Sequence, residues 1–286
     1  MAFARKLTER RIWGRIFRER LSEPVHLNLL SLGVDELPSF RRQVDFDLVV
    51  RQHNAFAILK AADFARRQGL REVCLVEFGV AAGAGLLNMV EIAARVTRET
   101  GVSIRVVGFD TGAGMPPARD YRDHPELYQE GDFRMDRAPL EARLAGRAEL
   151  VLGPIAETVP VFMATVTPSC PIGYVVIDVD YYSSTVDALT LFDAEPGRYL
   201  PVTLVYLDDV LHEEHNSWAG ELLAVGEFNE AHPLRKIEHH AFLETERLFR
   251  RARWIKHICY LHVLDHPRRN DVVRRRPTVD LANPYL

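Results

Sequence analysis

The feature that most constrains the fold is a repeated alternation of short apolar runs with helical stretches through the middle of the chain. Apolar runs bounded by turn residues predict buried strands, and apolar residues at helical spacing predict helices. The predicted strands cover residues 74–78, 104–110, 148–153, 173–180 and 202–209. The predicted helices cover residues 47–68, 86–100, 156–165, 183–192 and 221–231. This alternation predicts an α/β fold with a doubly wound, mostly parallel sheet.

Some segments of the chain depart from this alternation. Two late extended segments, 234–239 and 257–264, predict an antiparallel hairpin at the sheet edge. Residues 111–137 are too long for an ordinary connection and predict a functional lid. We therefore expect three parts: a basic N-terminal helical extension, a Rossmann-like domain, and a basic, proline-containing tail, over residues 1–45, 46–265 and 266–286.

Composition excludes several classes of protein. The chain has 286 residues, is 47% hydrophobic and 27% charged, and carries a net charge of −4, which argues against disorder and against a nucleic-acid partner. Three scattered cysteines form neither a disulfide framework nor a zinc knuckle. No apolar run reaches the roughly 20 residues of a membrane span, and no secretory signal follows Met1. We expect a cytoplasmic protein.

The first 21 residues are strongly basic, with large apolar residues at loosely helical spacing. A helix that packs on the main domain or on a second subunit is the first interpretation, and such a helix could form a homo-oligomer contact. A membrane-surface helix is the second interpretation. An organelle transit peptide is disfavoured, because Glu9 and Glu19 interrupt the segment.

Glycine or carboxylate residues stand at the end of every predicted parallel strand. In a doubly wound sheet, ligands bind beyond the carboxyl ends of the strands, near the point where the strand order reverses. These end positions are therefore the candidate site. They are Glu77 to Gly85, Asp110, Gly153, Asp178 with Asp180, and Asp208 with Asp209.

A glycine-rich bend follows the first strand. Gly79, Gly83 and Gly85 are spaced G-x-x-x-G-x-G, which differs from the G-x-G-x-x-G of dinucleotide binders. Glu77 before the bend would repel a pyrophosphate and would favour a cationic ligand. Asp110 stands where it could bind two ribose hydroxyls. A tight strand–helix turn without any ligand remains the alternative.

With these motifs the sequence resembles the class I S-adenosylmethionine-dependent methyltransferases, and within them the metal-dependent macrocin (TylF-like) O-methyltransferases. The resemblance implies that Glu77 and the loop glycines hold the methionine part of the cofactor, that Asp110 holds the ribose, and that Gly153 lies near the adenine. The motifs that carry it are VEFGVAAGAG (76–85), GFDTGAGMPP (108–117), GPIAETVP (153–160), IDVDYYSSTVDAL (177–189), YLDD (206–209) and WAGELLAVGEF (218–228).

Four carboxylates end two strands that should be neighbours, about 4.8 Å apart. Carboxylates at such short range raise one another's pKa, and a divalent cation with oxygen ligands, Mg²⁺ above all, would relieve the conflict. The candidate ligands are Asp178, Asp180, Asp208 and Asp209. In the resembled family such a cation binds the hydroxyl oxygens of the substrate. The alternative is that some of these acids cap helices, although Ser183 and Ser184 could do so for the helix after the fourth strand.

The predicted function is methyl transfer from S-adenosylmethionine to an oxygen of a small molecule, such as a sugar or another natural-product hydroxyl. Asp178 and His212 are the candidate proton acceptors, although a loop histidine can simply be solvated. One rival is a non-catalytic module of the same fold, because Val210 replaces the aromatic residue common after the paired aspartates. The other rival is an NAD-dependent oxidoreductase, which the glycine spacing disfavours.

Overall fold

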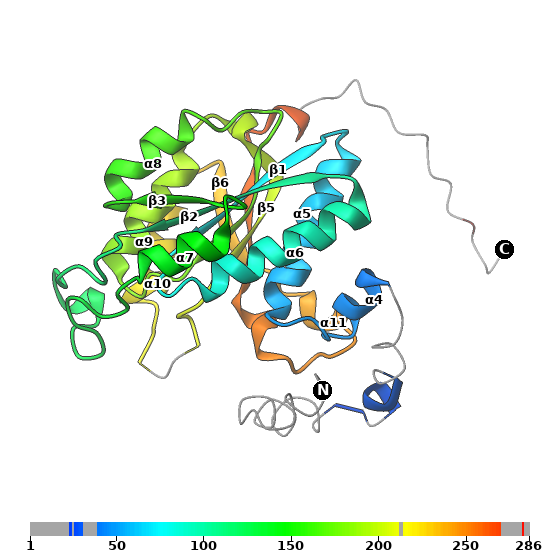
Figure 1. The fold of residues 1–286 in the computed structure, drawn as a ribbon, viewed down its shortest axis with the longest axis horizontal. Helices are drawn as coiled ribbons and strands as arrows, with labels where there is room; N and C mark the ends of the chain where they lie inside the picture. The colour runs from blue at the N-terminus through cyan, green and yellow to red at the C-terminus, as the bar shows by residue number, and fades with distance from the viewer. Residues whose placement is uncertain (1–22, 25, 31–38, 212–213, 270–281, 283–286) are drawn as a thin grey trace.

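A seven-stranded sheet forms the centre of the molecule (Figure 1). The computed structural model describes residues 23–24, 26–30, 39–211, 214–269 and 282. Its strands are β1 Glu72–Phe78, β2 Ser103–Asp110, β3 Glu149–Leu152, β4 Ile172–Ile177, β5 Tyr199–Leu207, β6 Arg235–His239 and β7 Ile258–Val263. The five predicted parallel strands and the two late extended segments are all present.

The strands lie in the order β3-β2-β1-β4-β5-β7-β6. The first five strands of the chain are parallel, and β7 runs antiparallel to both β5 and β6. The predicted antiparallel pair at the sheet edge is thereby confirmed, with β7 on its inner side. The chain leaves β1 towards β2 and β3 and then returns to β4 and β5, so the order reverses between β1 and β4. Ligand sites of doubly wound folds lie at that reversal.

Helices cover both faces of the sheet (Figure 1). One buried cluster holds side chains of the helices on the first face, and a second cluster holds those on the opposite face. The first face carries α4 Phe40–Asp45, α5 Gln52–Arg67, α6 Ala84–Thr100 and α7 Arg137–Leu144. The opposite face carries α8 Ile155–Met163, α9 Tyr182–Leu189 and α10 Gly220–Ala231. The short elements are α11 Leu243–Glu246 and the 3₁₀ turns η2 Tyr121–Asp123, η3 Thr190–Asp193, η4 Pro196–Arg198, η5 Arg253–His257 and η6 Pro267–Arg269.

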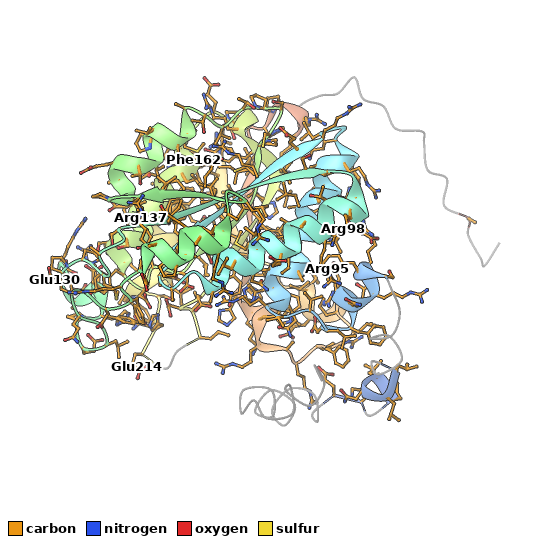
Figure 2. The ribbon with its side chains drawn as sticks, in the orientation of Figure 1. Arg95, Arg98, Glu130, Arg137, Phe162 and Glu214 are labelled. Atoms are coloured by element: carbon orange, nitrogen blue, oxygen red, sulfur yellow. The ribbon has the colours of Figure 1, made fainter. Side chains whose placement is uncertain are left out.

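The composition of β1 explains why the sheet is buried on both sides. Successive side chains of a strand point to opposite faces. Val73 and Leu75 pack in one cluster, whereas Val76 and Phe78 pack in the other. A strand that is covered on both faces therefore needs a continuous apolar run, as the sequence shows. Charged side chains such as Arg98 of α6 lie on the outer surfaces of the helices (Figure 2).

Helices α5 and α7 differ from what the sequence predicts. The helix expected from residue 47 begins at Gln52, because Asp47 and Arg51 both have a φ of 53°, outside the helical region. Asp47 is instead buried, and its carboxylate pairs with Arg247. Helix α7 was not predicted, since it begins where the proposed lid ends and only Leu140 and Leu144 of its eight residues are buried.

Several predictions about the chain ends remain untested. The basic helix of the first 21 residues lies outside the described residues, and the divisions at residues 45 and 266 stay predictions. Phe40 and Val44 of α4 are buried in the same cluster as α5 and α6. Among the described residues, no helix has both the length and the apolar composition to cross a membrane. The three cysteines are free.

Candidate functional site

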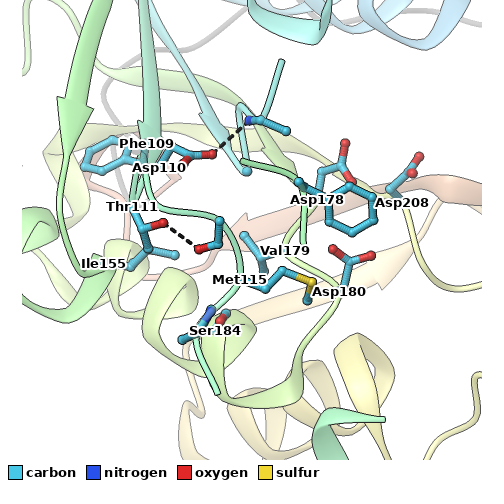
Figure 3. Close-up of a pocket in the computed structure, with 15 residues that line it drawn as sticks. Phe109, Asp110, Thr111, Met115, Ile155, Asp178, Val179, Asp180, Ser184 and Asp208 are labelled. Carbon is cyan, nitrogen blue, oxygen red and sulfur yellow. Dashed lines mark hydrogen bonds between the residues drawn. The ribbon is translucent and has the colours of Figure 1, made fainter. Parts of the chain in front are cut away.

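A cavity of about 350 Å³ lies at the carboxyl edge of the sheet, beside the strand reversal (Figure 3). Its walls come from the ends of β1, β2, β4 and β5, from the segment after β2, and from the starts of α8 and α9. The described residues on these walls include Gly79, Ala81, Asp110, Thr111, Met115, Phe133, Ile155, Asp178, Asp180, Ser184 and Asp208. Strand ends thus converge on one cavity, as the doubly wound sheet predicts.

Asp110 joins the end of β2 to the bend after β1. Its Oδ2 accepts a hydrogen bond from the Ala81 N–H at 2.8 Å, drawn in Figure 3, and its Oδ1 accepts one from the Gly112 N–H at 2.6 Å. A carboxylate has about four acceptor positions, so two backbone bonds leave capacity for a ligand hydroxyl. The two bonds fix the carboxylate on the cavity wall.

Two glycines of the bend, Gly79 and Gly83, make close approaches to different neighbours. Gly79 lies on the cavity wall with a φ of 87°, and a Cβ there would stand 1.7 Å from the Asp178 carbonyl oxygen. Gly83, at a φ of 81°, leaves room for Leu140 of α7. A side chain at either position would force the bend away from its neighbour. Gly79 therefore shapes the cavity, whereas Gly83 serves the packing of α7.

Glu77 lies beneath the bend and is only 2% exposed. A Cβ on Gly85 would stand 1.8 Å from its Oε1, so the bare backbone of Gly85 makes room for the carboxylate. Burial, and then the charge of Asp178, raise the pKa of Glu77 well above its usual value. Its Oε2 is buried without a hydrogen-bond partner among the described residues. Glu77 is not a wall residue of the cavity, so its contact with a cofactor stays a prediction.

Gly153 follows β3 and is held to the end of β2. Its N–H donates to the Asp110 carbonyl oxygen at 3.0 Å, and its φ is 135°. Gly153 itself does not line the cavity, but Ile155 two residues later does. The adenine contact predicted at Gly153 therefore stays a prediction.

The structure brings three of the four predicted metal ligands to one cavity: Asp178, Asp180 and Asp208. Asp209 does not line the cavity and is 4% exposed. Burial, followed by the charges of Asp208 and Asp209, raises the pKa of Asp178. Burial, followed by the charge of Asp180, raises the pKa of Asp209 to about 8. The predicted electrostatic conflict between these carboxylates is thus present.

Glu221 is a buried acid that the sequence reasoning missed. It is fully buried at the start of α10, and its Oε2 accepts a hydrogen bond from the Asp209 N–H at 3.0 Å. Burial, and then the charge of Asp209, raise its pKa well above the usual value. A signal was present in the sequence, since Glu221 stands directly before the apolar run of residues 222–225. Its contact with a residue of the β5 end could not be read from that pattern.

The segment after β2 is a loop whose two arms are hydrogen-bonded to each other near its base, at Met115 and residues 131–132. We call this point the neck of the pinned loop. The Met115 N–H donates to the Asp132 carbonyl oxygen, and the Gly131 N–H donates to the Met115 carbonyl oxygen, each at 2.9 Å. Beyond the neck the loop packs against α9. The segment between β2 and α7 that was predicted as a lid is therefore anchored to the domain at its neck and at its tip.

The tip of this loop caps α9, which corrects the capping prediction for Ser183 and Ser184. Asp123 is fully buried, and it accepts hydrogen bonds from the Ser183 N–H at 2.7 Å and from the Ser183 hydroxyl at 3.0 Å. Ser183 lies inside α9, and Ser184 lines the cavity. A remote aspartate supplies the cap because the loop brings it to the helix N-terminus. Asp178 and Asp180 are accordingly not needed as caps.

Two predicted features cannot be placed at the site. His212 lies outside the described residues, so its role as a proton acceptor stays a prediction. In the described part of the chain, no three histidine, cysteine, aspartate or glutamate side chains are arranged to hold a metal ion. The carboxylate oxygens at the cavity are nevertheless the donor type that Mg²⁺ prefers.

The fold and the cavity define a class: a doubly wound α/β protein with a ligand cavity at the strand reversal. Among solved structures, the chain is similar to the calicheamicin methyltransferase CalS11, with a TM-score of 0.50 and 22% identity over 82% of this chain and 90% of that one. The chain therefore shares the Rossmann-like fold of that structure, as predicted.

Two other solved structures are also similar. The O-methyltransferase NovP has a TM-score of 0.47 and 16% identity, with 65% of this chain and 75% of that chain covered. The O-methyltransferase TomG of Streptomyces achromogenes, solved with S-adenosylmethionine, has a TM-score of 0.42 and 13% identity, with 85% and 97% covered. No protein-family model and no curated protein sequence matches the chain.

Proposed function

We propose that this protein transfers a methyl group from S-adenosylmethionine to a hydroxyl oxygen of a small molecule. One observation carries the proposal: a single cavity joins Asp110 and the bend at Gly79 to the carboxylates Asp178, Asp180 and Asp208. The first group suits a nucleoside, and the second suits a hydroxyl that must lose its proton. The likeness to CalS11 supports the fold that this assignment needs.

Different residues of the cavity would bind the cofactor and accept the proton. S-adenosylmethionine supplies a methyl group on a sulfonium; the acceptor oxygen bonds to that carbon while the carbon–sulfur bond breaks and its electron pair goes to sulfur. Asp110 would bind the ribose hydroxyls with its unused acceptor positions. The buried carboxylate of Asp178 would accept the acceptor's proton. Positioning of the two reactants next to each other would supply most of the rate enhancement.

Mg²⁺ is part of the proposal. Asp178, Asp180 and Asp208 would hold the ion at the cavity, with Asp209 next to Asp208 in the chain. The cation would polarise the acceptor oxygen. Calorimetry with Mg²⁺ in the presence of S-adenosylhomocysteine tests this part, and the double variant Asp208→Ala, Asp209→Ala should abolish the binding. Equal binding of Mg²⁺ by wild type and the double variant would remove the metal from the proposal.

Calorimetric titration with S-adenosylhomocysteine tests the core of the proposal. Saturable binding with one site per chain is the expected result, and its absence would overturn methyl transfer altogether. Titration with NAD in parallel addresses the oxidoreductase rival. Cofactor binding in a protein that transfers labelled methyl groups to no hydroxyl compound would favour the non-catalytic module.

A further inference from the structure

The wall of the cavity combines two kinds of side chain. At its carboxylate end Asp178, Asp180 and Asp208 line it. Met115 and Phe133, from the two arms of the pinned loop, line the same cavity, and Figure 3 labels Met115. A molecule in the cavity would therefore meet both charged and apolar surface.

Phe133 is held in an unfavourable conformation with its ring exposed. Its φ is 58°, in the left-handed region that bulky residues rarely adopt, and it is 57% exposed. Such backbone strain amounts to about 1–3 kcal/mol and persists where the surroundings enforce it. Here the neck hydrogen bonds between Met115 and residues 131–132 hold the neighbouring backbone. The loop thus holds an exposed aromatic ring at the cavity in a backbone conformation that lowers the stability of the fold.

Contacts place this ring at the carboxylate end of the cavity. The ring centroids of Phe133 and Tyr128 are 6.4 Å apart, and those of Tyr128 and Tyr181 are 6.1 Å apart. Burial, and then the charge of Asp180, raise the pKa of Tyr128, so Tyr128 lies near Asp180. Tyr128 therefore links Phe133 to Asp180.

We propose that Phe133 is the specificity-determining residue for the methyl acceptor, and that the acceptor is an aryl hydroxyl, such as a phenol or catechol. This inference rests on the proposed function. Aromatic rings prefer offset or edge contacts with centroids about 4.5–7 Å apart, and a methionine sulfur adds a favourable contact with a ring. The acceptor ring would lie against Phe133 and Met115, with its hydroxyl towards Asp178 and Asp180.

A sugar ring fits this wall less well. Sugars carry hydroxyls around the whole ring, and each buried hydroxyl needs a hydrogen-bond partner. Of the wall residues from the loop, Met115, Pro116 and Phe133 offer no polar side-chain group, and the Thr111 hydroxyl already donates to the Gly114 carbonyl oxygen. In the transfer itself the phenolic oxygen bonds to the methyl carbon, the phenolic proton passes to a cavity carboxylate, and the sulfonium leaves as a neutral thioether.

The test measures binding to the complex with S-adenosylhomocysteine. Wild-type protein is titrated with 4-nitrocatechol, followed by absorbance, and with methyl glucoside, followed by calorimetry. We expect saturable binding of the catechol and weaker binding of the glucoside. Phe133→Asn, whose side chain tolerates the left-handed backbone, should weaken catechol binding about tenfold, whereas Phe133→Tyr should keep it within about threefold.

The outcomes are separable. Failure of the wild-type protein to bind S-adenosylhomocysteine would overturn the proposed function itself. With that binding intact, the acceptor inference is overturned by absent catechol binding, by tighter glucoside binding, or by an unchanged dissociation constant in Phe133→Asn. If Phe133→Asn weakens the binding of S-adenosylhomocysteine as much as the binding of catechol, the Phe133 ring covers the cofactor instead of the acceptor. Phe133→Leu, which keeps apolar bulk without a planar face, should fall between the asparagine and tyrosine variants.

Discussion

At the scale of single residues, positions without a side chain determine the geometry of the site. Gly79 allows the bend after β1 to touch the backbone at Asp178, and Gly85 leaves room for the buried carboxylate of Glu77. These contacts are closer than any Cβ permits. The glycine pattern that the sequence shows is therefore explained by approaches to neighbouring protein atoms.

Gly85→Ala should destabilise the protein by about 1–3 kcal/mol, because its Cβ would overlap Glu77 Oε1 and force a buried carboxylate to move. The free energy of unfolding, measured with urea, checks this. Gly226→Ala in α10 is the matched control, since nothing lies within 4 Å of its Cβ position. That variant should be neutral or more stable by up to about 1 kcal/mol.

A double-mutant cycle with Glu77 tests the reason for the Gly85 effect. In Glu77→Ala the carboxylate is gone, so adding Gly85→Ala to this variant should cost less than it does in the wild type. Additive changes in the free energy of unfolding would show that the overlap with Glu77 is not the cause.

Asp110→Asn should weaken the binding of S-adenosylhomocysteine about tenfold or more, because hydrogen bonds to a carboxylate are stronger than those to an amide. Asparagine keeps one oxygen for the backbone N–H groups that Asp110 now binds. Isothermal titration calorimetry measures the change. Asp136→Asn, at an exposed aspartate that caps no N–H group of α7, should bind as the wild type does. Equal affinities for both variants would contradict a ribose role for Asp110.

At the scale of elements, the loop after β2 and helix α9 form one unit. The loop is tied at its neck by Met115 and at its tip by Asp123, which caps α9. Ser184 of α9 and Phe133 of the loop both line the cavity. The cap therefore couples the position of the loop to the position of the site.

Asp123→Ala should remove the α9 cap and release the loop tip, with a loss of about 1–2 kcal/mol in the free energy of unfolding. Limited trypsin digestion should then cut faster at Arg119 and Arg122 within the loop. Asp120→Ala is the control, since exposed Asp120 pairs only with Arg122 beside it among the contacts described. Equal cleavage rates in both variants would show that Asp123 does not hold the loop.

At the scale of the whole molecule, a buried ion pair connects two ends of the domain. Arg247 Nη2 lies 2.8 Å from Asp47 Oδ1, and the side chains of both residues are nearly inaccessible. Arg247 also donates to the Val44 carbonyl oxygen, and the Trp254 N–H donates to Asp47 Oδ2. The segment before α5 is thereby fixed to the segment before β7.

Asp47→Asn should destabilise the protein by about 3 kcal/mol, because the buried Arg247 charge would then face only the more distant and exposed Asp45 carboxylate among its described ion pairs. Asparagine also tolerates the left-handed backbone, so strain would not explain the loss. Glu141→Ala breaks the exposed ion pair with Arg137 and should change the free energy of unfolding by less than about 0.5 kcal/mol. Similar losses in the two variants would contradict the assigned role of burial.

The sequence by itself determined the strands, most of the helices and the position of the candidate site. The continuous apolar run of β1 and the acids at the ends of β2, β4 and β5 are local patterns, and a doubly wound sheet necessarily gathers strand ends at one edge. The boundaries were less certain where local and distant interactions compete. Asp47 was predicted to be helical but is held out of the helix by Arg247, 200 residues away.

Only the tertiary structure decided which side chains meet around that edge. Asp123 caps α9 across 60 residues of sequence, Glu221 binds the Asp209 backbone, and Phe133 stands near Asp180 through Tyr128. Each contact depends on how a loop or helix packs against the sheet, and that packing has no signature in the spacing of neighbouring residues. Local patterns specify elements because backbone geometry repeats along the chain, whereas contacts between distant residues exist only once the elements are assembled.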